Sequence, residues 1–228
     1  VEGQVTSAIQ NVLSTDKKKI YVVTGHDEQS ISDSLSKTLE KMNVDVQDIS
    51  LVTQKKVPDD CSLLIEYGPQ SDLRDSEKTV IMDYLKKGGT AILMPGYVEK
   101  ETPNIDEILD YYGMSIQKGI IYEGVGHYEN YLNWIVPTIN TDADVMSKFG
   151  DNVVIGSSQG IKEQKSSSLR NGLKLTDILT TSKQSLLKKD PSSQNTDKEK
   201  GDLDGPFATG VYAEETLDEG TTKLTVIA

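Results

Sequence analysis

The chain has 228 residues, enough for one large domain or two small ones, and 36% of them are hydrophobic, which suffices for a core. Its 36 Asp and Glu residues outnumber its 24 Lys and Arg residues, and the net charge of −12 disfavours binding to nucleic acid or to an anionic membrane surface. The single cysteine, Cys61, leaves no internal disulfide. No stretch approaches the roughly 18 apolar residues of a membrane helix, and no signal peptide is present.

Hydrophobic periodicity predicts helices and strands that alternate along the chain. Helical spacing is present over residues 1–14, 29–42, 77–87, 104–112 and 142–149. Strand patterns are present over residues 19–25, 44–52, 62–67, 90–94, 114–123, 152–155, 206–213 and 222–227. We expect the last two strands to pair. The order of the elements indicates an α/β fold, a mainly parallel open sheet flanked by helices with an irregular, β-containing C-terminal part.

Local signals predict where several helices begin and end. Ser76 and Asn104 are expected to cap the helices that follow them, and Gly88 and Gly89 to end a helix through positive φ angles. The inward face of the helix at 29–42 is expected to consist of Ile31, Leu35, Leu39 and Met42.

The predicted organisation is one domain in two parts. We expect residues 1–165 to form the α/β domain and residues 166–228 an extension that completes it. Residues 190–205 are rich in Ser, Asp and Lys with almost no apolar residue, which predicts a mobile loop. The chain opens without Met and closes on a strand pattern at 223–228, so we expect it to be excised from a larger protein.

The most informative motif is Thr24, Gly25, His26, Asp27 and Glu28, directly after the first predicted strand. Ligands of open α/β sheets bind outside the carboxyl ends of the strands. A histidine with two carboxylates suits a general base or a metal ligand. The alternative is a turn in which Asp27 or Glu28 caps the next helix and His26 packs against its neighbours.

The same motif argues against a nucleotide cofactor. Gly25 stands alone, whereas phosphate-binding loops need several glycines, and Asp27 and Glu28 would repel an anion. We therefore expect no cofactor.

Two further segments resemble nucleophile sites only superficially. Cys61 follows Asp59 and Asp60, whose carboxylates would raise the pKa of a thiol, and it begins a strand where a nucleophile elbow would join a strand to a helix. We interpret it as an inert thiol. Residues 156–160 contain Ser157 and Ser158 between glycines, but no helical pattern follows, so we interpret them as a strand exit.

A second candidate surface surrounds His127 and Trp134, together with Tyr122, Tyr128 and Tyr131. Aromatic rings near asparagines suit stacking against a carbohydrate. The alternative is a hydrophobic plug that packs this loop on the core. Because the two histidines are far apart in sequence, we expect no metal site.

Several segments, in order, resemble the gliding-motility-type ABC transporter auxiliary component family. They are residues 1–9, 20–28, 68–73 with Glu77, 84–89, 179–182 and 205–208. The family typically shows Gly-His-Gly-Glu after the first strand, and Asp27 stands here in place of the second glycine. The resemblance spans nearly the whole chain.

This resemblance implies an amidotransferase-like or flavodoxin-like sheet without the amidotransferase active site. It also implies a domain on the extracytoplasmic side of a bacterial cell membrane, anchored through helices outside this chain, that works with an ABC permease and an ATPase. The chain has no Walker motif, so ATP hydrolysis would belong to the partner.

The leading hypothesis is therefore a non-enzymatic binding or scaffolding domain of an ABC-type transport system, whose ligand is a polysaccharide, a peptide or another subunit. One alternative is a hydrolase that uses His26 and Glu28, and another is a carbohydrate-binding module. The candidate ligand-binding residues are Thr24, Gly25, His26, Asp27, Glu28, Tyr67, Gly68, Pro69, Ser71, His127 and Trp134.

Overall fold

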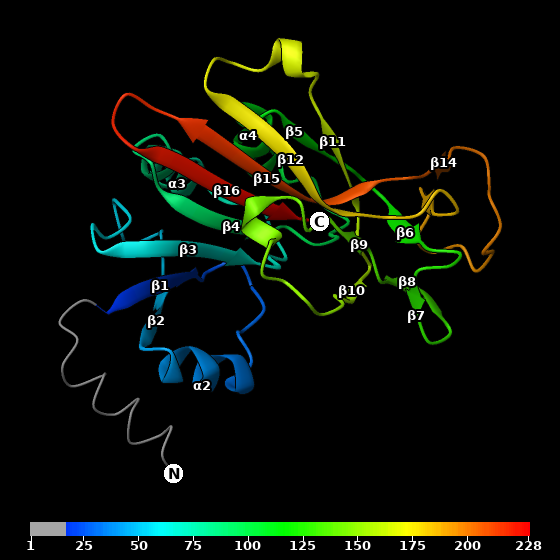
Figure 1. Cartoon of the computed structure of the whole chain (residues 1–228), viewed down its shortest axis with the longest axis horizontal. Helices are drawn as coiled ribbons and strands as arrows, with labels where there is room; N and C mark the ends of the chain where they lie inside the picture. Colours follow the sequence, from blue (N-terminus) through cyan, green and yellow to red (C-terminus); the bar gives the residue numbers. More distant parts are fainter. Residues whose placement is uncertain (1–16) are drawn as a thin grey trace.

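A computed structural model describes residues 17–228 as a mixed β-sheet with helices on its faces (Figure 1). The helix expected at 1–14 lies outside these residues. The ten-stranded sheet has the order β2-β1-β3-β4-β16-β15-β11-β5, with β12 paired to β15 and β9 paired to β12. The sheet therefore has a parallel half and an antiparallel half.

The parallel half consists of β2 (Val44–Ile49), β1 (Lys18–Val23), β3 (Cys61–Tyr67), β4 (Thr90–Met94) and β16 (Thr221–Ile227). These strands are rich in β-branched and aliphatic residues, which suit a sheet buried on both faces. Side chains alternate between the faces, so that Val22 packs in one hydrophobic cluster and Val23 in another. The sequence-predicted strands in this half are confirmed.

The antiparallel half consists of β15 (Ala208–Thr216), β11 (Gly160–Glu163), β5 (Met114–Gln117), β12 (Leu173–Thr180) and β9 (Thr138–Ile139). The expected pairing of the last two strands is confirmed, since β15 and β16 form an antiparallel hairpin. Gly210 is opposite Ile227 at its open end, and Thr216 is opposite Thr221 next to the turn. This hairpin lies in the middle of the sheet, between β4 and β11. The expectation of a mainly parallel sheet holds only up to β16.

Two small antiparallel sheets lie beyond the end of the main sheet (Figure 1). One contains β7 (His127–Tyr128), β8 (Tyr131–Ile135) and β10 (Ile155–Gly156). The other contains β6 (Ile120–Tyr122), β13 (Leu186–Lys188) and β14 (Leu203–Asp204). Ile121, Ile135, Leu187 and Phe207 form the core between them.

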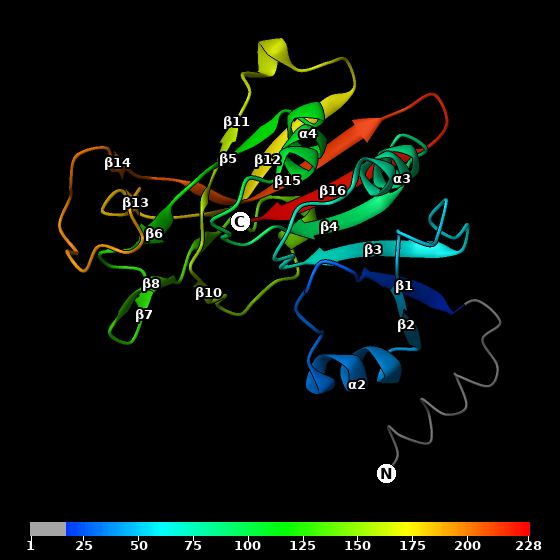
Figure 2. The same ribbon diagram turned by 180° about the vertical axis from the view of Figure 1, so that it is seen from behind.

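The helices cover the two faces of the sheet unequally. Helices α3 (Asp75–Leu85) and α4 (Pro103–Tyr111) lie side by side on one face (Figure 2) and bury Ile81, Leu85 and Ile108 completely. Helix α2 (Asp33–Lys41) lies beside β1 and β2 on the other face and has no buried residue. The main core is therefore on the α3–α4 face.

Several helix predictions were wrong in detail. Of the inward face predicted for the helix at 29–42, Ile31 and Leu39 are partly buried against β1 and β3, but Leu35 and Met42 are 48% and 67% exposed. Helix α2 begins after Ser32, whose hydroxyl accepts a hydrogen bond from the amide of Leu35. The predicted helix at 142–149 is only a short 3-10 turn, η1 (Asp144–Met146), and the strand at 152–155 is reduced to β10.

The predicted caps of the other helices were also displaced. Arg74, not Ser76, precedes α3, and the carboxylate of Glu77 accepts a hydrogen bond from its amide. Helix α4 begins one residue before Asn104, and the carboxylate of Asp72 accepts hydrogen bonds from the first amides of that helix. Gly88 has the predicted positive φ of 87°, but no such angle occurs at Gly89.

Candidate functional site

Two cavities open at the carboxyl ends of β1, β3 and β4, where ligands of α/β sheets bind. We call the first the strand-end crevice. It has a volume of about 630 Å³, and it is lined among others by Gly68, Gly96, Trp134 and Ser157. The second, the α2 cavity, has about 720 Å³ and lies between α2 and the ends of β1 and β2. Gln29 lines both cavities.

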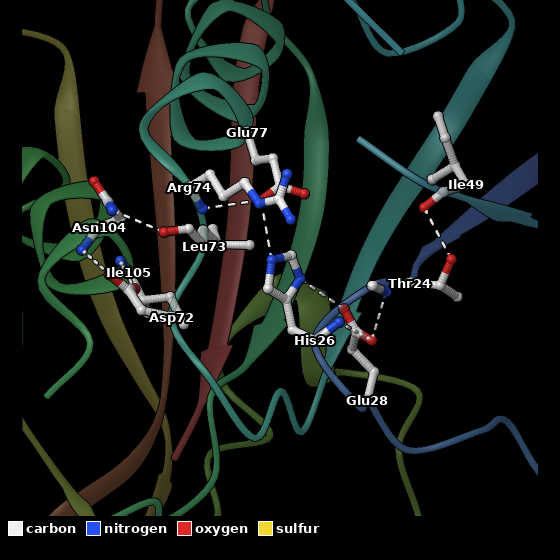
Figure 3. Close-up of polar contacts among 11 residues, drawn as sticks. Thr24, His26, Glu28, Ile49, Asp72, Leu73, Arg74, Glu77, Asn104 and Ile105 are labelled. Atoms are coloured by element: carbon white, nitrogen blue, oxygen red, sulfur yellow. Dashed lines mark hydrogen bonds and ion pairs between the residues drawn. The ribbon is translucent and has the colours of Figure 1, made fainter. Parts of the chain in front are cut away.

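Behind these cavities, His26 is held between two carboxylates (Figure 3). Its Nδ1 lies 3.1 Å from Oε1 of Glu28, and its Nε2 lies 3.0 Å from Oε2 of Glu77. The residue is only 6% exposed. A protonated imidazole ring could donate one hydrogen bond to each carboxylate. A neutral ring has only one N–H donor, so its other nitrogen could form a hydrogen bond only with a protonated carboxyl group.

Glu28 fixes the shape of the loop that follows β1. Its Oε2 accepts hydrogen bonds from the amides of Gly25 and His26, at 2.9 and 2.8 Å. Burial disfavours the ionised form, but the hydrogen bonds from these amides and from the His26 ring outweigh it and lower the pKa of Glu28. Glu28 is therefore an acceptor within its own loop. The expectation that Asp27 or Glu28 caps the next helix is wrong, since Ser32 caps α2, but His26 packs among its neighbours as the turn interpretation predicts.

Glu66 of β3 is a buried acid in the same region that forms no side-chain hydrogen bond. It is 2% exposed, and neither of its carboxyl oxygens has a hydrogen-bond partner. Burial, and then the negative charges of Glu28 and Glu77, raise the pKa of Glu66 to about 8. Three acidic side chains and one histidine thus share a mostly buried cluster next to the cavities.

The cluster does not have the geometry of a metal centre. Within residues 17–228, no group of three or more His, Cys, Asp or Glu side chains is arranged to hold a metal ion. Cys61 begins β3, whereas His26 follows the end of β1, so the thiol and the imidazole lie at opposite ends of these parallel strands. Burial, with a contribution from Asp60, raises the pKa of Cys61, as the sequence predicts.

The aromatic segment forms an exposed surface. We call Tyr128, Tyr131 and Trp134 the aromatic platform; they are 43%, 54% and 44% exposed. The ring of Trp134 lies 6.1 Å from that of Tyr128 and 5.4 Å from that of Tyr131, with interplanar angles of 24° and 33°. The plug interpretation is therefore wrong for these three rings.

The structure joins the two surfaces that the sequence suggested separately. Trp134 and Gly68 line the same strand-end crevice, and Thr24, Gly25, Asp27 and Glu28 line the adjoining α2 cavity. The remaining candidates are placed less directly. Pro69 is buried, Tyr67 and Ser71 are half-buried, and Nδ1 of His127 lies 2.9 Å from the carbonyl oxygen of Glu123.

Sequence reasoning did not name several residues of this region as candidates. Glu66 and Glu77 belong to the buried cluster, and the crevice is also lined by Gln29, Gln70, Gly96, Tyr97 and Ser157. The sequence did offer a signal for Glu66, since it is a charged residue directly after the apolar run of residues 63–65 in a predicted buried strand. The chain offered no comparable signal for Gln29.

Residues 17–217 match a family model described as ABC-type uncharacterized transport system. The chain belongs to this family. The match confirms the resemblance to an ABC-transport auxiliary family, and the family links the chain to an ABC transport system and so to a membrane. No curated protein sequence matches the chain.

Solved structures show the fold of this ABC-transport auxiliary chain. The N-terminal domain of mmIFT52 is 17% identical with a TM-score of 0.62, covering 92% of this chain and 85% of that one. A glutamine amidotransferase from Thermotoga maritima is 11% identical with a TM-score of 0.51, covering 94% and 75%. The cytoplasmic protein STM3548 from Salmonella typhimurium is 13% identical with a TM-score of 0.50, covering 92% and 86%. The amidotransferase-like sheet is confirmed.

No helix of the auxiliary chain within residues 17–228 has the length and apolar character needed to cross a membrane.

Two late segments that carried the family resemblance are bound to each other. The amide of Phe207 donates to the hydroxyl of Thr181 at 2.8 Å, and the amide of Thr181 donates to the carbonyl of Phe207 at 2.9 Å. The buried carboxylate of Glu123 accepts hydrogen bonds from the amide and hydroxyl of Ser182. These motifs therefore join the end of β12 to the start of β15.

Asp27, which replaces a glycine typical of the family, has a φ of 57°. This left-handed conformation is strained for a residue with a Cβ, although Asp tolerates it better than most. We expect Asp27→Gly to raise the free energy of unfolding by up to about 1 kcal/mol. Urea denaturation would measure it. Asp33→Gly, in the first turn of α2, should instead lower the stability, and a loss of stability in Asp27→Gly would contradict the prediction.

Proposed function

We propose that the chain is a non-enzymatic binding and scaffolding domain of an ABC-type transport system of the gliding-motility kind, on the extracytoplasmic side of a bacterial membrane. The observation that carries this proposal is the strand-end crevice, about 630 Å³ in volume, at the edge of an amidotransferase-like sheet. Its ligand would be recognised there, and the permease and ATPase would be its partners in the membrane.

The state of the titratable side chains supports a binding role without catalysis. Both ring nitrogens of His26 are already engaged by Glu28 and Glu77. A general base needs a free nitrogen within reach of a substrate proton. In this family member the histidine and its two carboxylates hold the loop after β1 against the start of α3.

The proposal can be tested by the accessibility of an introduced cysteine in intact cells. Glu219 lies in the exposed turn between β15 and β16, so Glu219→Cys in a Cys61→Ser background places one thiol at the surface. We expect a membrane-impermeant maleimide to label this thiol in intact cells that produce the protein in its natural membrane context. Affinity purification from the same membranes should recover the permease and the ATPase of its transport system.

Two controls show whether labelling reports the side of the membrane on which the introduced thiol lies. The Cys61→Ser protein without the introduced cysteine should remain unlabelled, and a cytosolic thiol protein should be labelled only after cell disruption. Labelling of the introduced cysteine only after disruption would place the domain in the cytoplasm and contradict the proposal.

A further inference from the structure

The two cavities differ in the charge of the side chains that line them. The α2 cavity carries five acidic residues: Asp27, Glu28, Glu40, Asp45 and Asp48. None of the ten residues that line the strand-end crevice is charged. In a chain with 26% charged residues and a net charge of −12, this uncharged crevice offers no counter-ion to a charged ligand.

The polar groups of the crevice suit a ligand with many hydroxyl groups. Gln29 and Gln70 contribute side-chain amides, and Tyr97 and Ser157 contribute hydroxyl groups. The amide nitrogen of Gln70 donates to the carbonyl of Gly68 at 2.9 Å, which leaves the side-chain oxygen available as an acceptor. Amides and hydroxyls both donate and accept, as neutral sugars do.

The aromatic platform continues the crevice outward through Trp134, which belongs to both. The indole is 44% exposed, and Gly156 approaches it closely enough that a Cβ there would lie 3.5 Å from Nε1. The rings of Tyr128 and Tyr131 are inclined to the indole by 24° and 33°, and all three rings are partly exposed beside the polar crevice. Flat apolar rings beside hydrogen-bonding groups are the combination that an amphipathic ring-shaped ligand requires.

The backbone of one lining residue of the crevice is also unusual. Ser157 has a φ of 54°, and its amide donates to the carbonyl of Asn133 at 2.8 Å. Such conformations cost free energy and gather at ligand-binding sites. Ser157 lines the crevice together with Trp134, which pairs with the preceding Gly156.

We infer that the strand-end crevice and the aromatic platform bind a neutral saccharide, with a sugar ring stacked on Trp134 and its hydroxyl groups bonded to Gln29, Gln70 and Ser157. This inference rests on the proposed function as a binding domain and names the chemical class of its ligand. A volume of about 630 Å³ lies within the range of about 300–1,000 Å³ typical of small-molecule sites.

The chain contains a single tryptophan, so its intrinsic fluorescence reports on Trp134 alone. We would titrate the 228-residue chain with neutral hexasaccharides of glucose, mannose and N-acetylglucosamine and follow the emission. We expect a saturable change in intensity or wavelength with at least one of them. Calorimetry with that saccharide should show that Trp134→Ala weakens binding at least tenfold and that Trp134→Phe weakens it less.

Matched variants make the outcome specific. Phe149→Ala removes another exposed ring, 42% exposed and outside the crevice lining, and should bind as the unmodified chain does. Gln29→Ala should weaken binding without changing the far-UV circular dichroism. Because the cysteine-labelling experiment does not involve a saccharide, it can succeed while this titration fails.

Three results would overturn the inference. One is the absence of a saturable change with every neutral saccharide of the set. Another is equal binding by Trp134→Ala and the unmodified chain. The third is Trp134-dependent binding of a proline-rich peptide in place of the saccharides, which would assign the platform to a protein partner.

Discussion

Replacing Glu66 by Gln is expected to remove most of the loss of stability that the chain suffers between pH 5 and pH 8. The pKa of Glu66 is about 8 in the folded chain, against an ordinary value of 4.5. Between these values the folded state binds more protons than the unfolded state, so stability decreases as the pH rises. One pKa unit corresponds to about 1.4 kcal/mol, so the ionisable side chain lowers the free energy of unfolding by on the order of 4 kcal/mol over this range.

Urea denaturation of both proteins at half-unit pH intervals would measure this effect. Glu66→Gln and the unmodified chain should be similarly stable at pH 5, where the buried acid is protonated, and the variant should be the more stable protein at pH 8. Glu99→Gln, at an exposed position, should leave the pH profile unchanged. Parallel profiles for Glu66→Gln and the unmodified chain would show that the Glu66 carboxyl ionises normally.

Part of the pH dependence should survive in Glu66→Gln. Burial and the neighbouring Asp177 raise the pKa of Glu163 to about 7, which acts in the same direction. The comparison between the two proteins isolates Glu66 because Glu163 is present in both.

Replacing Lys188 by Met is expected to lower the melting temperature by at least roughly 8 °C. Lys188 is completely buried, and its ammonium group lies 2.8 Å from Oδ2 of Asp202 and 2.8 Å from Oε2 of Glu199. Burial disfavours both charges, but the hydrogen bonds between them raise the pKa of Lys188 and lower that of Asp202 to about 2. Removal of the lysine leaves the Asp202 carboxylate buried without its counter-ion. Differential scanning calorimetry at pH 7 would measure the change.

A double variant tests the cause. Lys188→Met with Asp202→Asn removes both charges and keeps an oxygen that accepts the hydrogen bond from the amide of Lys189. It should recover a large part of the melting temperature lost in Lys188→Met. A double variant that melts below Lys188→Met would show that the loss comes from packing and not from an unpaired charge. Lys198→Met, in an exposed ion pair with Asp204, should change the melting temperature by no more than about 2 °C.

Lys188 also contacts the segment at residues 190–205, which the sequence predicts to be a mobile loop. Lys188 binds the carbonyl oxygen of Asp197 at 2.8 Å, and Asp202 accepts hydrogen bonds from the amides of Lys189 and Glu199. Composition alone indicated a polar segment without a core, but it could not reveal that one buried cation gathers these groups. The mobility of residues 190–205 stays a prediction.

Strands β1, β3 and β4 were predictable because each contains a short apolar run that is largely buried, whereas β2 at the edge of the sheet buries only Ile49. The order of the strands in the sheet was not predictable, because the hydrophobic pattern of residues 222–227 does not indicate which strands pair with that segment. The same limit applied to helix α2. Its apolar spacing was correct, but Leu35 and Met42 have no partner layer within residues 17–228 that buries them.

The candidate site was predictable as an edge of the sheet but not as a set of contacts. The strand ends pointed to residues 24–28 and 67–71, and the aromatic residues of 128–134 marked a second surface. Nothing in the sequence placed Trp134 beside Gly68, because that proximity depends on how the small sheet of β7, β8 and β10 lies against the main one. The pairing of His26 with Glu77 likewise joins residues 51 positions apart.

The central position of β16 has a consequence for how the chain is made. Thr90 of β4 pairs with Lys223 of β16, 133 positions later. At about 5–20 residues per second, a ribosome needs roughly 7 to 27 s to synthesise that interval. During this time β4 presents an open edge that can pair with another chain. The main sheet therefore cannot be completed until β16 has been made, and the edge of β4 can pair with another chain until then.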